Sequence, residues 1–279
     1  MIVLKTKSQI ETMNRCNEIV LSILEEISRM IRPGVAVVEL DSYAEKRTRE
    51  EGARPAFKGY QDFPSTLCVS INEQVVHGIP GPRKLKPGDV VSVDFGVVLD
   101  GLYGDGAETF PVGDIDPSVH KLVQVTRECL RRGIEQMQPG RHTGDVGHAI
   151  QSYAESQRCG VVKDFVGHGV GEKLHEDPQV PNYGRAGHGT RMEVGMVLAI
   201  EPMINMGGPE VEIGEDEWTV TTVDRLPSAH FERSVAVTED GPWILGSGAR
   251  PGVLSLALPM GQGRTSMEKT AVTSEKVAG

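Results

Sequence analysis

The chain has 279 residues, which is long enough to bury one sizeable core and to form a complete enzyme. A formal net charge of −10, without a basic run, argues against a protein that binds nucleic acid by broad neutralisation of phosphates. The four cysteines are too few for a disulfide scaffold and lack the close pairs of a zinc finger, so a reducing cytoplasm is expected. No apolar run has the length of a signal peptide or a membrane span.

Two helical patterns open the chain. Ser8 and Glu11 have the spacing of a capping box, and apolar side chains at helical spacing then continue to Ile31. Pro33-Gly34 is typical of the end of this helix, and a second helical pattern reaches about Glu51. Strand-like segments with turn signals follow as far as about residue 112.

The same order of elements then appears a second time. Asp116 and Pro117 are typical of the cap and first residue of a helix, and Pro139-Gly140 marks its end. A further helix and more strands follow. This repeat predicts two related α+β halves, at about 1–112 and 113–248, around a shared sheet. The seam between the halves is the natural place for a cleft.

The segment “DVVSVDFGVVLDGLYGDGAETF” predicts a β-hairpin with Asp100-Gly101 at its turn. Residues whose numbers sum to 201 then face each other, so Asp94 opposes Ala107, and Asp105 lies two positions along on the same face. Such diagonal neighbours are about 7–8 Å apart at the backbone, close enough for two carboxylates to hold one cation. A bulge at the glycines beside Asp105 would change this register.

Other acidic side chains also interrupt strand-like apolar runs. Glu201 lies within “MVLAIEPMI” and Glu232 within “SAHFERSVAV”. A buried carboxylate costs several kcal/mol unless it is paired, and no Lys or Arg interrupts the runs of Asp94 and Glu201. His168, in the glycine-rich “VGHGVG”, adds an imidazole. This oxygen-rich set suits a pair of Mn, Fe, Co or Zn ions about 3.5–4 Å apart, as in metal-assisted hydrolysis.

Simpler roles compete with this interpretation at each position. A single Asp or Glu more often lies on the surface or in a salt bridge, and a single loop histidine such as His168 is more often held by hydrogen bonds. The joint order and contexts of the five side chains are what favour a metal centre.

At these residues the chain resembles the methionine aminopeptidases, which share the pita-bread fold with proline-specific aminopeptidases and creatinase. The match covers about residues 1–248 and is most specific in “SINEQVVHGIP” (70–80), “VDFGVVLDGLYGDGAETF” (93–110), “GHGVGEKLHEDPQVPNYG” (167–184), “IEPMI” (200–204) and “SAHFERSVAVT” (228–238). The resemblance implies one catalytic α+β domain with two pseudo-symmetric halves around a curved antiparallel sheet. Residues 249–279 hold no aromatic side chain and are predicted to form a mobile tail.

The resemblance also implies roles for particular residues. It assigns the binding of two metal ions to Asp94, Asp105, His168, Glu201 and Glu232. His77 matches a cleft histidine near the scissile peptide, and His175 matches one that hydrogen-bonds the substrate, although either alone would more often be structural. The expected slot for the methionine side chain is formed by Tyr60, Phe63, Cys68, Leu174 and Trp218.

A few features separate this chain within the family it resembles. Glu201 and Glu232 are only 31 residues apart, without the long insertion of type II enzymes, and the chain starts almost directly at its first helix. A bacterial-like type I enzyme is therefore expected. Phe63 and Leu174 stand where relatives often have other apolar or aromatic residues, and Arg233-Ser234 stands where bacterial relatives commonly have His-Thr.

The implied activity is removal of the N-terminal methionine from peptides and nascent proteins with a small second residue. A hydroxide held between two metals would attack the first peptide carbonyl, with Glu201 as general base and then acid. Asp94 would also hold the free amino terminus, His175 would polarise the carbonyl oxygen, and His77 would steer the leaving nitrogen. The expected protein is a cytoplasmic monomer, with ribosome association left open.

Two rival functions use the same fold. A proline-specific aminopeptidase would need a different specificity pocket and usually carries a large N-terminal domain. A non-catalytic pita-bread module would bind peptides, but such modules typically lose metal ligands, and all five are present here.

Overall fold

The computed structural model describes residues 2–249 and 251–253, and the tail predicted at 249–279 lies almost wholly outside them. Four α-helices and a large sheet form most of this part of the chain. The helices are α1 (Lys7–Met30), α2 (Val37–Glu50), α3 (Pro117–Glu135) and α4 (Thr143–Ser156). No helix in the described residues combines the length and apolarity that a membrane crossing requires.

The main sheet runs in the order β1-β4-β5-β14-β9-β7-β8, with β2 also paired to β4 and β15 to β14. All of these pairings are antiparallel. Its strands are β1 (Arg54–Pro55), β2 (Leu67–Ile71), β4 (Val90–Leu99), β5 (Leu102–Pro111), β7 (Gly167–Gly169), β8 (Glu176–Val180), β9 (Val197–Ile200), β14 (Glu232–Thr238) and β15 (Gly241–Ile244).

Two three-stranded sheets, β13-β10-β6 and β11-β12-β3, flank the main one. Their strands are β3 (Gln74–Val76), β6 (Gly160–Val161), β10 (Met203–Asn205), β11 (Val211–Ile213), β12 (Val220–Thr222) and β13 (Ser228–His230). They bring segments from both parts of the chain together, since β12 pairs with β3.

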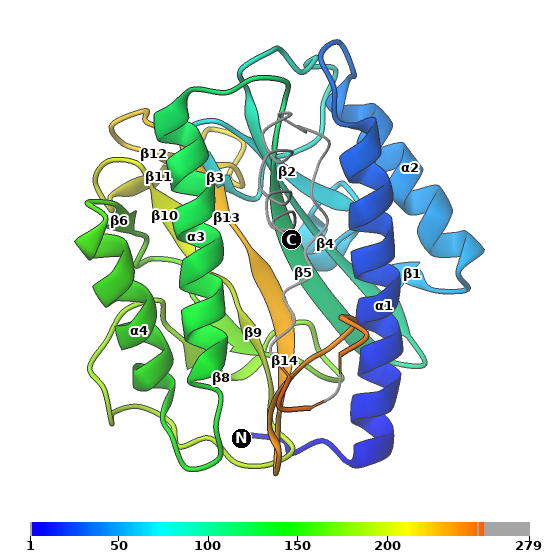
Figure 1. The fold of residues 1–279 in the computed structure, drawn as a ribbon. Coiled ribbons are helices and arrows are strands. Elements are labelled where there is room, and N and C mark those ends of the chain that lie inside the picture. The colour runs from blue at the N-terminus through cyan, green and yellow to red at the C-terminus, as the bar shows by residue number, and fades with distance from the viewer. Residues whose placement is uncertain (1, 250, 254–279) are drawn as a thin grey trace, which may run out of the picture.

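The helices lie in two pairs on either side of the central strands (Figure 1). Val20 and Leu24 of α1 join a core with Phe95 of β4, while Leu122 of α3 and Phe231 belong to a second core under α3 and α4. The predicted order of helix pair, strands, helix pair, strands is thus observed. The equivalence of 1–112 and 113–248 as repeated halves stays a prediction, because this arrangement alone does not establish it.

The β4–β5 hairpin has the predicted register along its whole length. Asp94 faces Ala107 and Gly96 faces Asp105, without a shift, so the bulge considered from the sequence is absent from this pair. Asp100 and Gly101 have φ of 51° and 80°, as a two-residue turn of this hand requires.

The start of α1 differs from the prediction. Thr6 is the N-cap and Gln9 completes the capping box, so Ser8 and Glu11 lie inside the helix. The two candidate boxes overlap in sequence, and the extended backbone at Thr6 decides which one forms.

Helix α1 packs closely against β5 at Gly104. A Cβ at this glycine would lie 2.7 Å from Cys16 Cβ, so any other residue would push the helix away. The close approach lets Asn17 accept a hydrogen bond from the Asp105 backbone N–H at 3.3 Å. The helix therefore helps to hold the strand at the residue that enters the cleft.

Arg233 forms a buried ion pair behind the main sheet. Its Nη2 donates to Glu108 Oε2 at 2.7 Å, and its Nη1 donates to the carbonyl oxygens of Ala107 and Glu232. Arg127 of α3 also contacts Glu108, at 3.3 Å.

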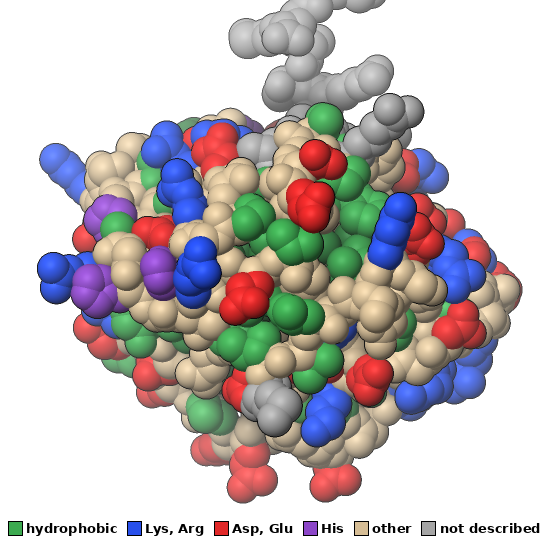
Figure 2. Space-filling model, turned by 90° about the horizontal axis from the view of Figure 1, so that it is seen from below, with side chains coloured by type: hydrophobic (Ala, Val, Ile, Leu, Met, Phe, Trp, Pro, Cys, Tyr) green, Lys and Arg blue, Asp and Glu red, His purple; other side chains and the backbone are tan. Residues whose placement is uncertain are grey.

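Charged side chains on the surface are mixed in sign, and the face shown in Figure 2 has no uniform basic patch.

We expect Arg233→Met to lower the free energy of unfolding by about 3–5 kcal/mol, because Glu108 would lose a buried counter-charge. Urea denaturation would measure this loss. Arg15→Met removes an exposed pair with Asp100 and should change stability by less than about 1 kcal/mol. Equal effects of the two substitutions would contradict the prediction.

Candidate metal centre

Neighbouring strands bring the first two candidate ligands together. Asp94 on β4 lies between Cys68 of β2 and Ala107 of β5, and Asp105 on β5 faces Gly96. Asp105 is buried, and Asp94 is half-buried with its Oδ1 shielded from solvent. The predicted diagonal pair of carboxylates is therefore present on one face of the sheet.

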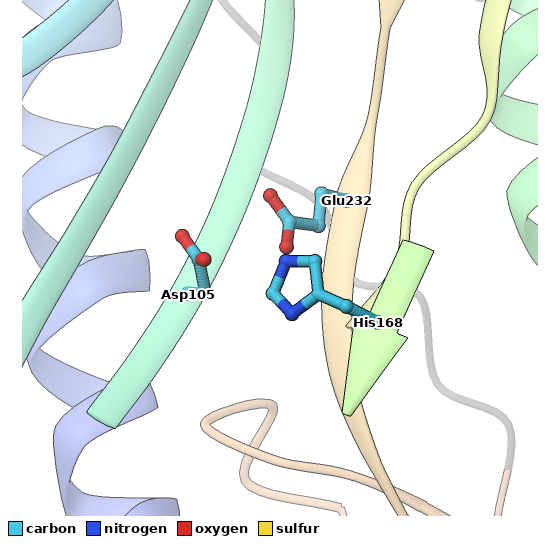
Figure 3. Close-up of side chains that lie close together, drawn as sticks. All are labelled: Asp105, His168 and Glu232. Carbon is cyan, nitrogen blue, oxygen red and sulfur yellow. The ribbon is translucent and has the colours of Figure 1, made fainter. Parts of the chain in front are cut away.

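The other three candidates come from adjacent strands. His168 lies on β7, Glu201 directly follows β9, and Glu232 is the first residue of β14 and faces Ala107. One ligand atom each from Asp105, His168 and Glu232 lie within 4.8 Å of one another, and the side chains point toward a common space (Figure 3). His168 Nε2 is 3.4 Å from Glu201 Oε1.

The four carboxylates are in an unfavourable place for negative charge. Burial raises the pKa of Asp94 to about 7, and burial followed by mutual repulsion raises the pKa of Asp105, Glu201 and Glu232 well above its ordinary range. Asp94 Oδ1 and Glu232 Oε1 are shielded from water and have no hydrogen-bond partner among the described residues. These orphaned oxygens and crowded acids fit bound divalent cations.

His168 is prepared to act as a ligand through Nε2. Its Nδ1 lies 2.8 Å from the Gly169 carbonyl oxygen, which can only accept, so the proton is on Nδ1 and the Nε2 lone pair faces the acids. Burial lowers the pKa of His168 to about 4, with a smaller effect from His175. The imidazole is therefore neutral, as metal coordination requires.

The two histidines singled out from the sequence line the same cavity as the acids. His77 has a left-handed backbone, with φ of 59°, and its ring packs edge-on against Phe165 at 5.4 Å between centroids. Burial lowers its pKa to about 4. His175 lies at the exposed mouth, 4.3 Å from His168 between ring centroids.

An apolar slot adjoins the acidic cluster. Phe63, Cys68 and Leu174 are buried in one hydrophobic cluster, against which Tyr60 and Trp218 pack. Phe63 meets Trp218 edge to face at 5.0 Å. All five expected slot residues line the cavity that also contains the five candidate ligands.

Two further buried residues were not predicted from the sequence, His230 in the cavity wall and Arg233 behind the main sheet. His230 is only 1% exposed, and its Nε2 is 3.7 Å from Glu201 Oε2 without a hydrogen bond. Arg233 was noticed only as a departure from relatives. Both are polar residues inside the apolar run that drew attention to Glu232, so the same signal would have found them.

A curved antiparallel sheet with buried acids and one imidazole beside a slot is typical of metal-dependent hydrolases. The model of metallopeptidase family M24 matches residues 11–239, and the chain belongs to this family. The expectations of a pita-bread fold and of a metal-dependent hydrolase are confirmed.

Individual proteins and solved structures within and beyond this family are also similar to the chain. The chain is 48% identical over 245 residues to methionine aminopeptidase 1 of Bacillus subtilis, covering 88% of this chain and 99% of that protein. The crystal structure of methionine aminopeptidase from Thermotoga maritima superposes with a TM-score of 0.87 at 46% identity, covering 88% and 99%. The prolidase from Pyrococcus furiosus, at 22% identity and a TM-score of 0.71 over 89% and 66%, shares the fold alone.

Metal binding can be tested through stability, without an activity assay. An excess of Mn²⁺ about 100-fold above its Kd should raise the Tm of chelated protein by roughly 5–10 °C, because cations bind only the folded cluster. Differential scanning fluorimetry would measure the shift. Glu232→Gln should remove most of it, and Asp100→Asn on the exposed turn should retain it. A Tm insensitive to both chelation and Mn²⁺ would rule out these ligands.

Proposed function

We propose that this chain removes the N-terminal methionine from peptides and nascent proteins. The observation that carries the proposal is the meeting of the acidic cluster and the apolar slot in one cavity. Cys68 of the slot faces Asp94 of the cluster across the β2–β4 pair, so a side chain in the slot would place its own backbone beside the acids. The relatives named methionine aminopeptidase support the same activity.

The proposed centre binds two divalent ions, drawn from Co, Mn, Fe and Zn. Five side chains, four of them carboxylates able to bridge, exceed the needs of a single ion, and oxygen-rich sets accept several metals. When bound, such ions would polarise the peptide carbonyl and lower the pKa of water toward neutrality. Asp94, Asp105, His168, Glu201 and Glu232 are the proposed ligands.

Glu201 is the proposed proton carrier. Its carboxylate projects into the cavity from the end of β9, between His168 and His230. It would take a proton from the attacking water as the new C–O bond forms, then deliver that proton to the leaving nitrogen as the C–N bond breaks. The oxygen of the water thus ends on the carboxyl group of methionine, and one of its protons ends on the amine of the shortened peptide.

The remaining polar residues would orient the substrate. Asp94 would hold the free amino terminus beside the slot, His175 would donate to the carbonyl oxygen as negative charge develops there, and His77 would steer the leaving nitrogen. Phe165 stands against His77, which leaves little room on that side. This crowding supports a preference for small second residues.

The slot favours an unbranched, polarisable side chain. Its walls are aromatic and apolar, and the Cys68 thiol adds a second polarisable sulfur. We further propose that the protein is a monomer located in the cytoplasm.

Asp105→Asn and Glu201→Gln should each reduce release of methionine from Met-Ala-Ser by at least about 10³-fold, since each removes a charge at the reacting centre. Far-ultraviolet circular dichroism should show that both variants remain folded. Asp100→Asn makes the same chemical change on an exposed turn and should keep full activity. Full activity in either cluster variant would overturn the assignment.

A reconstitution experiment tests metal and substrate together. Chelated protein, given Mn, Fe, Co or Zn separately with metal content measured, should recover activity on Met-Ala-Ser with up to two ions per chain. It should cleave X-Pro ends far more slowly where X is not methionine, because the slot selects the first side chain. Faster cleavage of X-Pro than of Met-Ala would favour the proline-specific alternative.

A further inference from the structure

Tyr60 makes a contact that its place in the methionine slot does not require. Its hydroxyl oxygen lies 2.7 Å from His175 Nδ1, and the two ring centroids are 5.3 Å apart at an interplanar angle of 46°. The two residues are 115 positions apart in sequence, one before β2 and the other just before β8. This hydrogen bond therefore links the apolar slot to the histidine at the cavity mouth.

The chemistry of the two groups sets the direction of this hydrogen bond. A phenol O–H is a good donor and its oxygen a poor acceptor, whereas an unprotonated imidazole nitrogen is a strong acceptor. A neutral imidazole carries a single N–H. When Tyr60 donates to Nδ1, that single proton must be on Nε2.

The backbone around Tyr60 holds it in a defined place. Tyr60 starts a short 3-10 turn, Tyr60–Asp62, in which Gln61 and Asp62 have left-handed φ of 46° and 69°. Its N–H donates to the Phe57 carbonyl oxygen, and its own carbonyl accepts from Phe63 N–H, both at 2.9 Å. Left-handed backbone at non-glycine residues persists only where the surroundings enforce it, and it clusters at functional sites.

We propose that Tyr60 is a positioning residue whose hydroxyl fixes the tautomer and ring plane of His175, so that Nε2–H is directed at the substrate carbonyl oxygen. The ring of Tyr60 forms part of the slot, and its hydroxyl orients the carbonyl donor. Tyr60 thereby aligns both the side chain and the carbonyl group of the substrate's first residue. This inference rests on the proposed function for the meaning of the carbonyl contact.

The test is Tyr60→Phe in the full chain, which removes the hydroxyl and keeps the ring in the slot. For the Zn²⁺-loaded protein labelled with ¹⁵N in histidine rings, the long-range ¹H–¹⁵N spectrum reports the tautomer of His175. We expect Nε2–H in the wild type, and in the variant a shift of the His175 Nδ1 resonance with partial transfer of the proton to Nδ1. On Met-Ala-Ser, kcat should fall about three- to tenfold, with KM changed less than about twofold.

Tyr103→Phe is the matched control. Tyr103 packs against the same hydrophobic cluster but is not among the residues lining the cavity, so its variant should show wild-type spectra and rates. A wild type with the proton on Nδ1 would overturn the proposal, as would a Tyr60→Phe protein with unchanged His175 resonances, whatever its rate. If the wild type released no methionine, the proposed function would fail, whereas the spectrum would still decide the tautomer.

Discussion

The crowding of four carboxylates in the interior is the constraint on which the rest of this structure depends. Ionised carboxylates that share one cavity repel each other strongly where water cannot screen them. The sheet holds them together through continuous pairing of β4, β5, β14 and β9. Such a cluster is tolerable where cations neutralise it, and the fold is organised around that requirement.

The parts of this arrangement that depend on residues close together in sequence could be predicted from the sequence. The Asp100-Gly101 turn fixes the β4–β5 register, which places Asp94 and Asp105 on one face before any other strand is considered. The same local logic placed Pro117 correctly at the start of α3. It failed at α1, where two cap patterns overlap in sequence and the extended backbone at Thr6 selects the one that forms.

Contacts between distant segments could not be derived in this way. The pairing of β14 with β5 and β9 brings Glu232 to Asp105, and nothing near Glu232 in sequence encodes that register. For His168 and the slot, the resemblance to known proteins supplied what local rules could not. The role of Arg233 also depends on a distant contact. The alternation of side chains along β14 turns it to the face opposite Glu232, where it forms an ion pair with Glu108.

The residues of the acidic cluster span positions 94 to 232 of the chain. No shorter contiguous fragment contains the whole set, so neither half of the chain carries the complete centre. Opening any one of the four strands would separate the ligands and weaken the binding of a cation. The main sheet and a divalent metal held by these ligands should therefore behave as a single cooperative unit, in which opening of a strand releases the metal.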